Sequence, residues 1–106
     1  MLYYELGDVP SAEKSFREGA RLGSQNPGLY YNYGLLLQQL GNMKASEKIL
    51  LEGFKLNPQA ANINYALAYL YMGQNLRTKA LIHAKTLQQI DPGNPDYQGL
   101  FRDLGL

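Results

Sequence analysis

The stretch PGLYYNYGLLLQQLGNMKASEKILLEGFKLNP, residues 27–58, has the pattern of two helices joined by a short turn near Gly41. In its second half Ile49, Leu50 and Phe54 fall on one stripe of a helix, while lysines and glutamates fall on the opposite face. This apolar stripe is too wide to be buried inside a single pair of helices. The pair therefore needs a neighbour of the same kind to cover it.

The rest of the chain supplies such neighbours, because the pattern returns when the sequence is shifted by 34 residues. The matching columns are Leu2, Leu36 and Leu70; Tyr3, Leu37 and Tyr71; Ala12, Ser46 and Ala80; Phe16, Leu50 and Ala84; and Leu22, Leu56 and Ile90. We expect one domain over residues 1–106, made of a partial repeat at 1–26, complete repeats at 27–60 and 61–94, and a capping helix at 95–106.

Glycines at expected helix ends, prolines at expected helix starts and the lack of period-two alternation indicate an all-α fold. Asn26, Asn42, Asn57 and Asn75 stand where a side-chain oxygen can cap the first turn of a helix. The expected helices cover about residues 1–6, 9–22, 27–40, 43–56, 59–72, 76–90 and 95–104.

Two glycines inside the expected helices indicate close packing. A glycine in a helix interior costs about 1 kcal/mol relative to alanine, so we interpret Gly34 and Gly53 as places where two helices approach too closely for a side chain. A third glycine, Gly73, comes two residues before the column that contains Gly41. This offset predicts a longer turn or a shorter first helix in the third copy.

The composition excludes several functions. The formal charge is +1, so no strong field attracts nucleic acid or an anionic membrane surface. There are no cysteines, which removes disulfides and thiol chemistry, and no apolar run approaches the ~20 residues needed for membrane insertion. The nine carboxylates are spread along the chain, and the lone histidine, His83, has no acidic neighbour in the sequence. We expect no enzyme activity, no metal site and no cofactor.

The repeating residues resemble the tetratricopeptide repeat (TPR) family. Its signature is a large aromatic residue, a leucine-glycine pair and a tyrosine on the first helix, with alanine and phenylalanine on the second helix and a closing proline. The matches are Tyr30, Tyr33-Gly34, Leu37, Ser46, Leu50 and Pro58 in the central copy; Asn64, Leu67-Ala68, Tyr71, Ala80, Ala84 and Pro92 in the third; and Tyr3, Leu6-Gly7, Ala12 and Phe16 in the first. The resemblance covers about residues 1–94 and implies a right-handed superhelical stack of antiparallel helix pairs. Residues 95–106 look like the family's extra capping helix.

In TPR folds the first helices of successive repeats line a concave groove, so the resemblance implies that a partner meets the outward faces of these helices. Tyrosine combines a large apolar area with a hydrogen-bonding tip, and amide side chains can pair with the backbone of an extended peptide. The alternative is that several of the tyrosines fill gaps between helices. The candidate groove residues are Tyr4, Tyr31, Leu35, Gln38, Asn62, Tyr65, Tyr69 and Met72.

The chemistry of this face bears on the partner. The family's carboxylate-clamp members carry lysine, arginine and asparagine there to grip a C-terminal carboxylate, whereas this chain carries tyrosines, leucines and amides. We therefore expect an apolar or amphipathic peptide or partner helix rather than a chaperone tail. The leading hypothesis is a non-catalytic protein-interaction scaffold.

Two other functions stay open at this point. The sequence begins in the middle of an expected first helix, so Leu2, Tyr3 and Leu6 would lack a preceding repeat to cover them. This favours a fragment of a longer protein, or an edge that pairs with another chain and makes the repeats a spacer or homo-oligomerisation module. An RNA-binding helical repeat is the third hypothesis, and the near-neutral charge argues against it.

Overall fold

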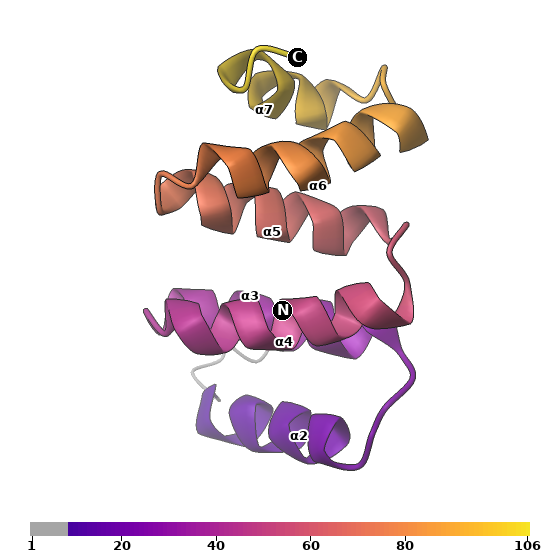
Figure 1. Ribbon diagram of the computed structural model, residues 1–106. Coiled ribbons are helices and arrows are strands. Elements are labelled where there is room, and N and C mark those ends of the chain that lie inside the picture. Colours follow the sequence, from indigo (N-terminus) through magenta and orange to yellow (C-terminus); the bar gives the residue numbers. More distant parts are fainter. Residues whose placement is uncertain (1–8) are drawn as a thin grey trace.

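The computed structural model describes residues 9–106, and every regular element in that part is helical, which confirms the all-α expectation. The elements are α2 (Val9–Arg21), α3 (Pro27–Gln39), α4 (Met43–Leu56), α5 (Ala61–Gly73), α6 (Arg77–Ile90), the 3-10 helix η1 (Pro95–Tyr97) and α7 (Gln98–Asp103). In Figure 1 α2 lies at one end, α3 and α4 overlap at the next level, and α5, α6 and α7 follow toward the other end, which gives an elongated body of 40 × 25 × 23 Å. The expected helix at 1–6, with Leu2, Tyr3, Tyr4 and Leu6, lies outside the described residues. None of the helices within 9–106 combines the length and apolarity needed to cross a membrane.

The helices repeat with the period found in the sequence. The bounds of α5 and α6 are those of α3 and α4 moved by 34 residues. The turns also match, because Gly41 and Asn75 both adopt the left-handed conformation, with φ of 79° and 62°. The longer turn or shorter helix expected from Gly73 is therefore wrong. Asparagine tolerates the left-handed region better than most residues, so Asn75 takes the place of Gly41 without a change of length.

The capping predictions hold for two asparagines and fail for two. Asn26 Oδ1 accepts from the backbone N–H of Gly28 at 2.9 Å, and Asn42 Oδ1 accepts from that of Ala45 at 3.4 Å. Asn57 instead closes the turn between α4 and α5, where its Oδ1 accepts from the N–H of Gln59 at 3.1 Å. For this reason α5 begins at Ala61, two residues later than expected. Asn75 occupies the left-handed turn and caps no helix.

The segment after α6 differs slightly from the single helix expected at 95–104. It opens with the 3-10 helix η1, where Asn94 Oδ1 accepts from the N–H of Asp96 at 2.8 Å, and only then continues as α7. Leu100, Phe101 and Leu104 are buried. The segment therefore packs its apolar side against the core, as expected of a capping helix.

The core runs through the stack and includes most of the described residues that match the family signature. Tyr30 and Tyr33 are buried on α3, as expected of residues that hold the stack together. The Oγ of Ser46, on α4, donates to the carbonyl of Gly34 at 2.8 Å, which joins the two helices of the central pair. Fully buried apolar side chains line the interior: Leu36, Leu50, Ile63, Leu67, Leu87 and Leu100.

Gly34 and Gly53 mark the close approaches predicted from the sequence. A Cβ on Gly34 would lie 2.5 Å from Leu50 Cδ2. A Cβ on Gly53 would lie 2.6 Å from Ile63 Cδ1 and 2.8 Å from Tyr30 Cβ. Because the Cβ of Tyr30 is fixed to the α3 backbone, it cannot move aside without moving that helix. Gly53 is thus the point where α3, α4 and α5 come together.

Replacing Gly53 with alanine should lower the free energy of unfolding by up to about 2 kcal/mol. Overpacking costs about 1–3 kcal/mol, and the better helix propensity of alanine offsets about 1 kcal/mol of it. Urea unfolding followed by far-UV circular dichroism measures the change. The matched control is Gly73→Ala, because Gly73 also lies in a helix but has nothing within 4 Å of an added Cβ. The control should be neutral or slightly stabilising, and equal losses in both variants would contradict a specific close approach at Gly53.

Candidate functional site

Seven of the eight candidate groove residues lie in the described part of the chain, on two helices whose sequences contain no charged residue. α3 contributes Tyr31, Leu35 and Gln38, and α5 contributes Asn62, Tyr65, Tyr69 and Met72. We call the surface formed by these residues the α3–α5 face. Its lack of charge distinguishes it from the lysine- and glutamate-bearing surface of α4.

The two helices share a pocket on this face. It has a volume of about 180 Å³, and Gln38 of α3 and Tyr69 of α5 both line it. Met43, Leu70 and Gly73 complete most of the wall. Residues predicted from two successive repeats therefore meet at one concavity.

Gln38 has an unusual environment in this pocket. Its Nε2 atom is buried and has no hydrogen-bond partner among the described residues. A buried donor without a partner costs about 1–3 kcal/mol. Within residues 9–106 the Nε2 donor of Gln38 is thus left unused, next to an apolar pocket.

Aromatic rings gather at the other end of the face. The ring centroids of Tyr65 and Tyr69 lie 4.7 Å apart, and those of Tyr65 and Tyr97 lie 5.1 Å apart. Tyr97 comes from η1 and was missed in the sequence, because residues 95–106 were interpreted only as a cap. The one available signal was an aromatic residue just after the helix-starting Pro95.

The remaining candidates differ in exposure. Tyr69 is 47% exposed, and Asn62 is exposed with its Oδ1 accepting from the N–H of Ile63 at 2.8 Å. The others, Tyr31, Leu35, Tyr65 and Met72, are half-buried and pack against the core. Each of these four side chains therefore fills a gap between helices and still leaves part of its surface exposed.

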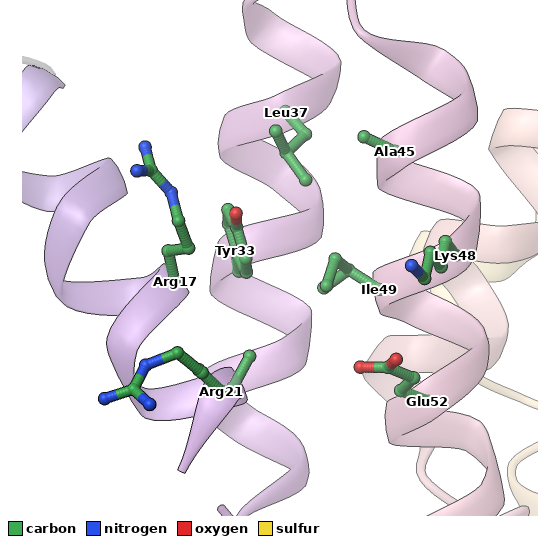
Figure 2. A pocket seen from close by; sticks show the side chains of 9 residues that line it. Arg17, Arg21, Tyr33, Leu37, Ala45, Lys48, Ile49 and Glu52 are labelled. Atoms are coloured by element: carbon green, nitrogen blue, oxygen red, sulfur yellow. The ribbon is translucent and has the colours of Figure 1, made fainter. Parts of the chain in front are cut away.

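Another depression, with a volume of about 330 Å³, lies between α2, α3 and α4 and contains none of the candidate groove residues (Figure 2). Arg17 and Arg21 border it from α2, and Lys48 and Glu52 border it from α4. Both arginines already have partners, since Arg17 pairs with Glu13 at 3.0 Å and Arg21 with Glu18 at 2.9 Å. Little positive charge is therefore left for an anionic ligand.

His83 is a buried titratable group that belongs to the core. Its side chain is 6% exposed, and its Nδ1 lies 2.9 Å from Asn64 Oδ1. Asn64 Nδ2 donates to the carbonyls of Pro58 and Ala60, both at 2.9 Å. The Oδ1 atom is thus the acceptor, so Nδ1 of His83 carries the proton. Burial lowers the pKa of His83.

These contacts give His83 a structural role. Its ring packs edge-on against Phe54 at 5.1 Å and stacks with Tyr71 at 5.8 Å. Within residues 9–106 no group of three or more histidine, aspartate or glutamate side chains is placed to hold a metal ion.

Comparisons with known proteins agree on the fold. Residues 27–60 match the model of the tetratricopeptide repeat family, and no match was found among curated proteins. One similar solved structure is the first TPR of Spaghetti (RPAP3) bound to the HSP90 peptide SRMEEVD, with 16% identity, a TM-score of 0.85, and coverage of 97% of this chain and 84% of that chain. Another is the Yersinia enterocolitica type III secretion translocator chaperone SycD, with 14% identity, a TM-score of 0.77, and coverage of 97% and 71%.

The layered helix pairs define an all-α helical-repeat protein. More narrowly, residues 27–60 match the tetratricopeptide repeat family, and the described stack shares the fold of a solved TPR domain.

The buried histidine should make stability depend on pH. Because burial lowers the folded-state pKa of His83, the unfolded state binds the proton more readily below about pH 6.5, and stability is lost as the pH falls through that value. Between about pH 8 and about pH 5.5 this group should cost the fold at most about 1.4 kcal/mol.

Urea unfolding at the two pH values measures this loss. The variant His83→Gln removes the titration, so its stability, although lower at both pH values, should change less between them. An equal change in the variant and the original chain would contradict a lowered pKa for His83.

Proposed function

We propose that this chain is a non-catalytic protein-interaction scaffold that binds an extended peptide or partner helix on the α3–α5 face. The observation that carries the proposal is the pocket shared by Gln38 and Tyr69, because two candidates from successive repeats line one concavity. Apolar walls with a few placed polar groups are typical of ligand sites.

The unpartnered amide of Gln38 supports the same proposal. A backbone carbonyl of a bound segment would give the Nε2 atom the partner that it lacks in the free chain. Tyr69 stands beside it with its ring partly exposed, and tyrosine is among the residues that contribute most to binding energy at interfaces.

The uncharged face also bears on the kind of partner. The similar RPAP3 domain was solved with the peptide SRMEEVD, which is acidic near its C-terminus. α3 and α5 offer no lysine or arginine for such carboxylates. We therefore propose an apolar or amphipathic segment for this chain. The spacer or self-association alternative rests on residues 1–8 and has no support from the described part.

Selection from a displayed library of random peptides tests the proposal. Peptides captured by the original chain should bind Tyr69→Ala about tenfold more weakly, as expected for the loss of one interface aromatic. Lys85→Ala, an exposed change on α6, is the control and should leave binding unchanged. Unaltered binding by Tyr69→Ala, with an intact cooperative melt, would overturn the proposal.

The variant Gln38→Met should change stability and peptide binding in opposite directions. Methionine has a similar shape and no donor, so it removes the desolvation cost of the buried amide and should raise the free energy of unfolding by about 1 kcal/mol. The same change should weaken capture of the selected peptides. A variant that loses stability, or that binds the peptides as well as the original chain, would contradict the role given to the amide.

A further inference from the structure

Four tyrosines from three elements converge at one end of the α3–α5 face. Tyr65 and Tyr69 come from α5, Tyr97 comes from η1, and Tyr31 of α3 lies near enough for its phenol to contribute to the raised pKa of Tyr97. We call these four residues the tyrosine cluster. It is continuous with the shared pocket, because Tyr69 belongs to both.

A ring contact and a hydrogen bond hold the cluster in place. Tyr97 packs edge-on against the buried ring of Phe101, with centroids 6.2 Å apart. The Tyr65 hydroxyl donates to the backbone carbonyl of Asp96 at 3.3 Å. These contacts fix the rings before any ligand arrives, which lowers the entropic cost of binding.

The charges around the cluster are mostly negative. α3 and α5 carry none, and after Lys85 the chain contains Asp91, Asp96 and Asp103 against a single base, Arg102. Burial is the main cause of the raised pKa of Tyr97, and Asp91 and Asp96 raise it further. Asp96 also contributes to the raised pKa of Tyr65. The carboxylates are therefore close enough for their negative potential to act on the rings.

We propose that the tyrosine cluster is a subsite for a positively charged side chain, arginine or lysine, in the segment that the α3–α5 face binds. The inference rests on the proposed function and names the charge of its partner. A cation within about 6 Å of a tyrosine ring centroid is attracted to the ring face, and the carboxylates of Asp91 and Asp96 add Coulomb attraction from the rim. An acidic side chain would be repelled. A segment lying across Tyr69 thus places a cationic residue on the cluster and an apolar residue in the shared pocket.

Small capped probes test the subsite without a known partner. N-acetyl-arginine amide is titrated into the chain carrying ring-labelled tyrosines and followed by NMR, with N-acetyl-glutamine amide as the uncharged comparison. The arginine probe should shift the resonances of Tyr65, Tyr69 and Tyr97 in a saturable way, and the glutamine probe should not. Equal shifts with both probes, or no shift with arginine, would overturn the inference.

The variant Asp96→Asn removes the carboxylate charge and keeps the backbone hydrogen bonds of residue 96. The backbone carbonyl that accepts from Tyr65 and the backbone N–H that donates to Asn94 both remain in this variant. Binding of the arginine probe should weaken about two- to fivefold, the range expected for one exposed carboxylate. Glu52→Gln changes the net charge equally but lies at the depression between α2, α3 and α4, so it should leave binding unchanged. Equal affinities in Asp96→Asn and the original chain would overturn the inference.

The two proposals fail in different ways. Peptides that depend on Tyr69 but show no enrichment of arginine or lysine would overturn the cationic subsite and leave the scaffold function standing. Peptides that do not depend on Tyr69 would overturn the scaffold function on this face. Enrichment of arginine or lysine, lost in Asp96→Asn but not in Glu52→Gln, would support the subsite.

Discussion

The missing side chain at Gly53 is the constraint on which the rest of the stack depends. Tyr30 from α3 and Ile63 from α5 both close onto α4 at this point, within distances that a Cβ would not allow. The two first helices are thereby fixed against a common second helix. Gln38 and Tyr69 lie on those two first helices. The concavity that they line therefore depends on how the helices pack at Gly53.

In the third copy different residues occupy the positions that correspond to Gly53 and Tyr30. Leu87 stands in the column of Gly53, and Asn64 stands in the column of Tyr30. A larger residue on the second helix is thus matched by a smaller one on the first, which keeps the buried volume similar. The smaller residue is polar, and a buried amide needs partners. His83 and the carbonyls of Pro58 and Ala60 supply them.

Much of the fold could be predicted from the sequence, because a 34-residue period is a strong signal and glycines such as Gly34 and Gly53 have a clear steric meaning. The start of α5 could not, since Asn57 has the residue type of a helix cap but closes a turn instead. Seven candidate groove residues could be placed on the first helices by their columns. Tyr97 could not, because its position depends on how η1 folds back onto α5. The unpartnered amide of Gln38 also required coordinates, since no sequence pattern reports a missing hydrogen bond.

The hydrogen bonds of Asn64 have a mechanical consequence. The short connector between α4 and α5 joins one helix pair to the next. Asn64 ties two carbonyls of that connector, those of Pro58 and Ala60, to a histidine on α6. Through Asn64, a side chain of the second helix of one pair is therefore tied to the joint with the preceding pair, so the geometry of this joint depends on packing inside the following repeat.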